Sequence, residues 1–315
     1  MSIHSRIDGV YRDISDTYNM ISGVNHEVLE IYNTIEGANR EIFKSSNSIG
    51  DLPIGALVKS NNTKYNGAVI RFIIGHQVSG RTKLITEKVI SLKCFDAKEP
   101  NNPNTSRKNY GSNRYGESNI DQWLNSASSP WYSARHTYDA PPNDANVWLS
   151  HNDYEAEPGF LSNFEANFQT AILDTVIRTA KPVSDGAGYE DISRRVYLLS
   201  GTEIGQRNEN GIIEGTRWDY FDNISRCQVY PTEEAVNVSE YKATNISPTQ
   251  YVAWWLRTPV SNNTHAAYHI FPDAGNLTNG YVYIGRMGIC PALEIPSDTA
   301  VSSDTDSDGC YILQF

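Results

Sequence analysis

Residues 3–49 read IHSRIDGVYRDISDTYNMISGVNHEVLEIYNTIEGANREIFKSSNSI and repeat an apolar residue every seven positions. One series is almost entirely isoleucine, and a second lies three or four residues from it, as the a and d positions of a coiled coil do. A strict seven-residue spacing winds helices into a left-handed supercoil. The sequence therefore predicts a coiled-coil stalk over residues 1–49. Its predicted core consists of Ile7, Val10, Ile14, Ile21, Val24, Val28, Ile31, Ile35 and Ile42.

The side chains of this core favour a parallel homotrimer, because β-branched residues at both core positions shift the preference from two chains towards three. At about 1.5 Å per residue the rod would be roughly 70 Å long. An amphipathic helix lying on its own globular domain is the alternative, which explains the apolar face but not the uninterrupted period. Gly9, Gly23 and Gly37 share one outward heptad position. Each costs about 1 kcal/mol of helix propensity, so we expect the helix to need its partners.

The composition argues against several classes of partner. The chain has 315 residues, a formal net charge of −11 and no basic cluster, so we expect no nucleic-acid partner. It has no apolar run long enough for membrane insertion, and its amino terminus lacks the features of a secretion signal. The four cysteines are far apart with no CxxC pair, which favours buried free thiols over a zinc site or a disulfide framework.

Residues 50–315 are predicted to form an α+β head with many short strands, few helices and long loops. The run GDLPIG at 50–55 ends the stalk, because two glycines and a proline interrupt a helix. A hairpin is expected around the polar turn SNNTKYNG at 60–67. Apolar spacing predicts helices at 118–126, with Ser118 as N-cap, at 163–175 and at 232–241. Strands are expected at 56–59, 68–75, 83–95, 193–200, 254–257, 281–284 and 290–295.

The aromatic content indicates a recognition surface. Nineteen tyrosines and six tryptophans accompany abundant Asn, Ser and Gly, and rigid amphipathic rings with small polar groups are typical of binding loops. Some of the tryptophans belong to the core instead. Trp123, Trp254 and Trp255 are predicted to be buried.

Several motifs of the head resemble a family of uncharacterised domains from bacteriophage virion proteins and clostridial proteins. They are ITEKVISLKCFDAKEPNN, YGSNRYGESNIDQWLNS, GFLSNF, VYLLSGTEIG, WWLRTP, GICPALEIP and DTDSDGCY, in this order. The resemblance covers roughly residues 51–315 and leaves the stalk outside.

The head is more distantly similar to the C-type-lectin-like fold that formylglycine-generating-enzyme-like domains share. A paired-aromatic strand ending in Arg-Thr and a closing Gly-x-x-x-Ala-Leu strand carry this similarity, at 254–258 and 288–293. In some relatives of that fold the stretch between the two strands is diversified into binding sites. The resemblance thus implies that residues 261–285 form a ligand-binding face, with an ordinary solvated loop as the alternative.

The residues of this stretch support the same interpretation, because they are mostly polar or aromatic and include no Lys or Glu. The predicted ligand-binding residues are Asn262, Asn263, His265, Tyr268, His269, Phe271, Asp273, Asn276, Asn279, Tyr281 and Tyr283.

Three further motifs are weak. Asp304, Asp306 and Asp308 have the spacing of a calcium loop, but Phe315 stands where a bidentate Glu is expected, so we prefer an acidic surface turn to calcium binding. The tripeptide EPN at 99–101 copies a lectin calcium motif but lies far from the strand that should follow it. His265 and His269 are four residues apart in a segment with loop and strand character, which does not favour a zinc site. No other cofactor is expected.

These observations lead to two hypotheses about function. The first is a homotrimeric virion fibre or spike, outside the cell, that attaches to other virion proteins through its stalk and binds a host surface glycan or protein through its heads. The second is a structural or decoration component of the capsid or tail that binds no host ligand. No nucleophile or metalloprotease pattern occurs, so we expect no enzyme activity. A glycosidase pair of distant carboxylates is the remaining alternative.

Overall fold

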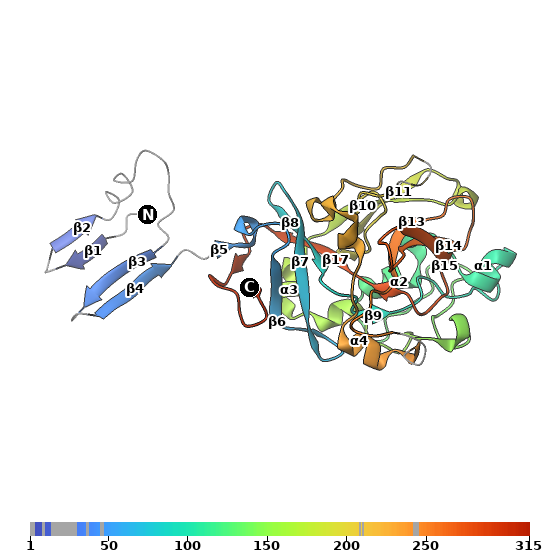
Figure 1. Ribbon diagram of the computed structural model, residues 1–315, viewed down its shortest axis with the longest axis horizontal. Coiled ribbons are helices and arrows are strands. Elements are labelled where there is room, and N and C mark those ends of the chain that lie inside the picture. Colours follow the sequence, from blue (N-terminus) through green and yellow to red (C-terminus); the bar gives the residue numbers. More distant parts are fainter. Residues whose placement is uncertain are drawn as a thin grey trace. The chain divides into compact units, whose positions relative to one another are not determined.

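The computed structural model describes residues 4–7, 10–13, 30–35, 38–44, 47–207, 209, 211–241 and 246–315, with side chains from residue 47 onwards (Figure 1). The chain divides into two compact units, Met1–Asn47 and Ser48–Phe315.

The described residues of the first unit form strands, so the predicted coiled coil is not shown. Two antiparallel pairs are present, and they consist of β1 (His4–Ile7) with β2 (Val10–Asp13) and β3 (Glu30–Ile35) with β4 (Ala38–Lys44). In the sequence Asp8-Gly9 and Glu36-Gly37 separate the paired strands, and Asp-Gly is typical of two-residue hairpins.

A single chain also offers no partner helices to cover an a/d stripe, which removes the main stabilisation of the predicted helix. Of the predicted core residues, five lie in these strands, namely Ile7, Val10, Ile31, Ile35 and Ile42. The other four lie outside the described residues, namely Ile14, Ile21, Val24 and Val28.

The largest sheet of the head contains eight strands in the order β12-β17-β8-β7-β6-β19-β18-β5. They span β5 (Asn47–Ser48), β6 (Leu57–Tyr65), β7 (Ala68–Val78), β8 (Arg81–Thr86), β12 (Val196–Tyr197), β17 (Ala292–Pro296), β18 (Ala300–Val301) and β19 (Cys310–Gln314). The predicted hairpin is confirmed as β6 and β7. Its turn is shorter than expected because Asn66 and Gly67 both adopt positive φ, at 49° and 89°, as a two-residue hairpin turn requires.

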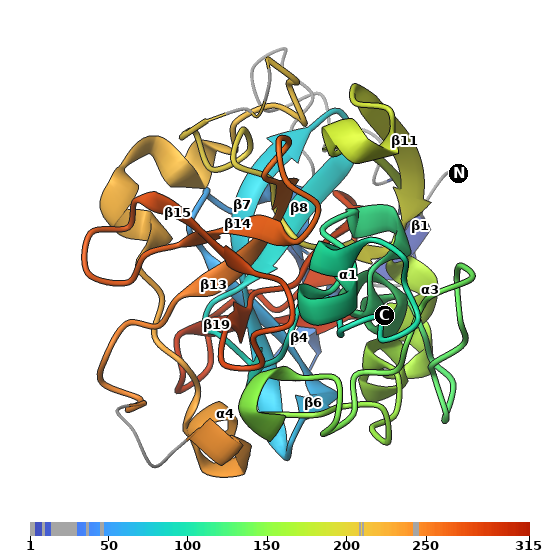
Figure 2. The same cartoon turned by 90° about the vertical axis from the view of Figure 1, so that its right-hand side faces the viewer.

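A second sheet has five strands in the order β15-β14-β13-β16-β9. They span β9 (Ser91–Leu92), β13 (Trp254–Pro259), β14 (Ala266–Ile270), β15 (Leu277–Tyr281) and β16 (Gly288–Ile289). All six residues of β13 are buried. The strand therefore forms the centre of the head, and Figure 2 shows β14 and β15 beside it. β10 (Thr175–Ala180) and β11 (Tyr189–Arg194) pair as a separate hairpin.

The described helices are short. They are α1 (Thr105–Tyr110), α2 (Asn119–Leu124), α3 (Ala166–Ala171), α4 (Glu233–Val238) and the 3-10 turns η2 (Ile49–Asp51), η3 (Tyr115–Glu117), η4 (Trp148–Ser150), η5 (Phe160–Asn163), η6 (Val183–Asp185), η7 (Asp219–Asp222) and η8 (Ile224–Cys227). The Ser118 N-cap is confirmed, since its hydroxyl accepts from the Asp121 N–H at 3.3 Å. Among the described residues, no helix has the length and apolarity needed to cross a bilayer.

Some predicted elements were wrong in extent. The helix expected at 163–175 is limited to α3, because the chain turns at Ile172 and enters β10. The strand expected at 193–200 is limited to the last two residues of β11 and to β12, and the one expected at 281–284 is wrong because β15 ends at Tyr281. Other expectations are confirmed. The four cysteines are free and buried, and Trp123, Trp254 and Trp255 are fully buried.

Arg257, in the middle of β13, is fully buried and joins four parts of the head. Its guanidinium donates to the carbonyls of Arg178 at 3.0 Å, Leu198 at 2.8 Å and Glu214 at 2.5 Å. It also pairs with the Glu203 carboxylate at 2.5 Å. We call this set of contacts the Arg257 network. Because a buried charge is tolerated only when it is paired and hydrogen-bonded, these four segments must stay in place together.

We predict that Arg257→Ala lowers the free energy of unfolding by about 3–5 kcal/mol, because it leaves the buried Glu203 carboxylate and three backbone carbonyls without their hydrogen-bond partner. Urea denaturation followed by fluorescence measures this loss. The control is Arg226→Ala, which removes a surface ion pair with Asp222 and should cost less than about 1 kcal/mol. Equal losses in the two variants would contradict a central role for Arg257.

Candidate functional site

The structure divides the predicted face 261–285 between the two ends of one hairpin. β14 and β15 pair antiparallel, with Ala266 opposite Tyr281 and Ile270 opposite Leu277. Residues 261–265 therefore lie beside the end of β15, whereas residues 271–276 form the turn at the opposite end of the hairpin. The predicted residues cannot all contact one small ligand.

Four ring side chains gather at the first of these ends, and we call them the aromatic cluster: Tyr110, His265, Tyr281 and Tyr283. The Tyr110 and Tyr281 rings stack with centroids 4.5 Å apart. The His265 ring lies 5.1 Å from Tyr110 and 5.2 Å from Tyr281, and Tyr283 meets Tyr110 edge-on at 5.5 Å. Tyr281 is 45% exposed, so the cluster presents an aromatic surface that its own neighbours hold rigid.

Tyr110 belongs to this cluster although it lies outside the predicted stretch. It is the last residue of α1, and Gly111 follows it with φ 84°. A Cβ at position 111 would lie 2.8 Å from the carbonyl oxygen of Asp96, so the close approach requires glycine. The buried Asp96 carboxylate then accepts from the Ser112 N–H at 2.8 Å. The motif that contains YGSNRYG thus fixes Tyr110 by backbone geometry.

A buried asparagine connects the loop that follows Tyr110 to the turn that carries His265. The Asn113 side-chain amide donates to the carbonyls of Val260 at 3.1 Å, Asn263 at 3.2 Å and Ala266 at 2.7 Å. The Asn263 side chain accepts from the His265 and Ala266 N–H groups, at 2.9 and 2.8 Å. The turn that carries His265 is therefore held on both sides, and Asn263 has a structural contact there.

Two predicted binding residues point into the protein. His269 is 6% exposed and meets the Trp255 ring edge-on at 5.6 Å, and burial lowers its pKa. Tyr268 donates its hydroxyl to Glu209 at 2.8 Å, and burial followed by this hydrogen bond raises the pKa of Tyr268 to about 12. Five other predicted residues are exposed, namely Asn262, Phe271, Asp273, Asn276 and Asn279.

The acidic turn at 304–309 already contains a cation. Lys59 of β6 places its ammonium 2.7 Å from Asp306 and 2.5 Å from Asp308. Asp306 also accepts from the N–H groups of Asp308 and Cys310. Asp304 is exposed and accepts only locally, from the Ser303 hydroxyl at 3.1 Å. A lysine thus supplies the charge that calcium would supply, which supports the acidic surface turn.

Pro100 and Asn101 of the EPN motif are exposed, but its carboxylate is not. Glu99 is 1% exposed, accepts from Asn102, and lies 3.4 Å from the His136 imidazole. A buried carboxylate of this kind cannot contact an external sugar.

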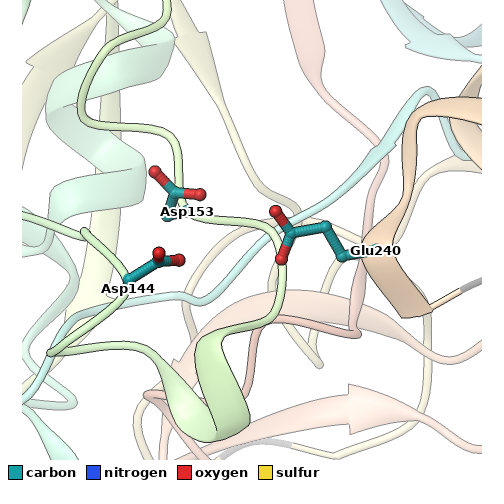
Figure 3. Close-up of side chains that lie close together, drawn as sticks. All are labelled: Asp144, Asp153 and Glu240. Atoms are coloured by element: carbon teal, nitrogen blue, oxygen red, sulfur yellow. The ribbon is translucent and has the colours of Figure 1, made fainter.

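Among the described residues, three carboxylates converge where a metal ion could bind: Asp144, Asp153 and Glu240 (Figure 3). One oxygen of each lies within 4.8 Å of the others. Burial, followed by repulsion from Asp144 and Glu240, raises the pKa of Asp153. Sequence reasoning missed this group because its members come from two loops and from the segment that follows α4, almost 100 residues apart.

A family model with the description Domain of unknown function (DUF6273) matches residues 79–297. No curated protein and no solved structure matches the chain. The matched segment includes the five-stranded sheet, the aromatic cluster and the three converging carboxylates, whereas β6 and β19 of the large sheet lie outside it.

We predict that Lys59 controls part of the acid stability of the head. The Lys59 hydrogen bond holds the pKa of Asp306 below its usual value, so the unfolded chain binds a proton more readily than the folded one. This contribution is present above pH 4, near the ordinary Asp pKa of about 3.9, and is lost as the pH falls through the lower folded pKa. Urea denaturation between pH 2 and 7 should therefore show a smaller acid loss in Lys59→Met than in the wild type.

Asp304→Asn is the control, since Asp304 has no lysine contact, and it should keep the wild-type pH profile. Calcium should leave the melting temperature of the wild type unchanged. Identical pH profiles for the wild type and Lys59→Met, or stabilisation by calcium, would contradict the conclusion that Lys59 and not calcium neutralises the acidic turn.

Proposed function

The chain belongs to the family described as Domain of unknown function (DUF6273), and we propose that it is the fibre or spike protein of a phage or phage-like particle, whose head binds a host surface ligand. In this proposal the protein works outside the cell as part of a virion. It binds its ligand without chemical conversion.

The aromatic cluster is the observation that carries the proposal. β5, where the chain enters the head, and the pair α1 with β14–β15 lie at opposite ends of the head (Figure 1). Figure 2 looks onto the end that carries α1 and the hairpin. A ligand on a cell surface could reach this end while the other is attached. Since the four rings are already packed, binding would cost little side-chain entropy, and their faces suit the apolar face of a sugar ring or an aromatic side chain.

A C-type-lectin-like architecture of the head is part of the same proposal. Its support is that the Arg-Thr pair lies in a buried central strand, β13, just before its last residue, and that the segment 288–293 contributes to both sheets through β16 and β17. Three short α-helices and long loops accompany these strands between residues 93 and 174. No relationship of chemistry follows from such a likeness.

A parallel homotrimer with a coiled-coil stalk is also proposed, on the heptad pattern of residues 3–49. Three chains would cover the isoleucine stripe that one chain leaves without partners. Three weak sites on one stalk would gain avidity through effective concentration. Attachment to other virion proteins would use the stalk.

The β10–β11 hairpin favours a second candidate, a capsid or tail component that packs against its neighbours and binds no host ligand. Val176 and Val183, in and next to this hairpin, are 71% and 57% exposed, and Tyr189 is 48% exposed. An assembly contact would cover these side chains.

We predict that Tyr281→Ala reduces binding of the full-length protein to host cells and to glycan arrays by at least about tenfold, because it removes the most exposed ring of the cluster. Tyr251→Ala is the matched control, since Tyr251 is also an exposed tyrosine stacked on another, Tyr230, at 4.2 Å. Equal binding by the two variants would contradict the proposal that the aromatic cluster binds the host ligand. A folded wild-type protein that binds no host surface would favour the packing role.

The trimer is tested by light scattering after gel filtration. The wild type should have three times the 35.2 kDa chain mass, and the double variant Ile21→Asp with Val28→Asp should be a monomer whose head melts at the wild-type temperature. A monomeric wild type, or a head that unfolds with the double substitution, would refute the stalk.

A further inference from the structure

A cavity of about 210 Å³ opens beside β9, and we call it the β9 pocket. Four segments that are distant in the sequence surround it. They are the β6–β7 turn, residues 91–93, residues 152–163 and the end of α4. Its size is below that of pockets for drug-sized ligands, which begin at about 300 Å³, and far above the share of one water molecule, about 30 Å³. The volume suits one small polar molecule.

The floor of the β9 pocket is built from buried polar side chains. Lys93 is 1% exposed, pairs with Glu157 at 2.6 Å, and lies 4.7 Å from the ring centres of both Trp123 and Tyr154. The Tyr65 hydroxyl, also buried, donates to the other Glu157 oxygen at 2.9 Å. An ammonium held by two rings and a carboxylate cannot change its position easily. The floor is therefore rigid, and its two charges neutralise each other.

The net charge of the pocket is negative and comes from two carboxylates on its wall. Asp153 and Glu240 both line the cavity, and among the described residues neither forms an ion pair with Lys or Arg. Glu240 and Asn152 hold each other in place, since each accepts the backbone N–H of the other, at 3.1 and 2.9 Å. Figure 3 shows the Asp153 and Glu240 carboxylates facing the same space as Asp144. A rigid neutral floor thus meets a wall with excess negative charge.

From this combination we propose that the β9 pocket binds a small polyol that carries a protonated amine, of the size of a single amino sugar. The ammonium would lie between Asp153 and Glu240, where charge-assisted hydrogen bonds are strongest. Hydroxyl groups would face the floor, where Glu157 and the amides of Asn66 and Asn163 supply acceptors and donors.

The same geometry argues against a bare metal ion as the occupant. The cavity is several times larger than an ion needs, and one Glu240 oxygen is already engaged by a backbone N–H. Buried polar side chains on the floor would also have no role in holding an ion at the wall. This site is separate from the aromatic cluster and does not depend on the proposed attachment function.

Calorimetry of the full-length protein with glucosamine tests the proposal, with glucose and N-acetylglucosamine as uncharged probes of similar size. We expect glucosamine to bind at least about tenfold more tightly than either neutral sugar. Asp153→Asn and Glu240→Gln, which keep the shape of the wall, should each weaken glucosamine binding by a similar factor. Glu233→Gln is the matched control, because it removes one carboxylate from α4, the helix that precedes Glu240, outside the pocket.

Tyr281→Ala should leave glucosamine binding unchanged, which separates this site from the aromatic cluster. The proposal is overturned if glucosamine does not bind to the wild type, if the neutral sugars bind equally well, or if Glu233→Gln weakens binding as much as Asp153→Asn. It is also overturned if calcium or magnesium binds through Asp153 and Glu240 while glucosamine does not.

Discussion

The head depends on one buried charge. Arg257 lies in a strand that is buried along its whole length, and its guanidinium holds the carbonyls of Arg178, Leu198 and Glu214 together with the Glu203 carboxylate. A hydrophobic residue there would fill the space but satisfy none of these groups, and each buried polar group without a partner costs about 1–3 kcal/mol. The long loops between 198 and 214 can therefore remain irregular and still have a fixed position.

This constraint explains how both candidate binding regions are positioned without long helices. β13 carries Arg257 and pairs on one side with β14, and the turn before β14 holds His265. On its other side β13 pairs with β16, which in turn pairs with β9, the strand directly before Lys93. The aromatic cluster and the β9 pocket thus lie on opposite edges of one sheet. Each is completed by a loop with its own polar anchor, Asn113 for the cluster and Asn152 for the pocket. Rigid sheet edges with loop-borne side chains suit recognition.

Local patterns in the sequence predicted some of the elements but did not predict which distant residues come together. The buried Trp254–Arg257 strand, the Ser118 cap and the β6–β7 hairpin follow from periodicity and turn chemistry, and all three are confirmed. Tyr110 and Asp153 were missed because loops more than 80 residues from their partners bring them into place. His269 was expected on the surface, yet it is buried and its ring packs edge-on against Trp255 of the neighbouring strand β13. The heptad pattern predicts contacts between chains, which a single chain cannot form.

We propose that the end of the head with the aromatic cluster meets the host. Hydrogen–deuterium exchange of the full-length protein, with and without fragments of the host cell envelope, tests it most directly. We expect protection confined to residues 105–110, 262–265 and 279–283, with unchanged exchange in the β10–β11 hairpin. Binding that protects the hairpin instead and leaves these three segments unchanged would contradict it.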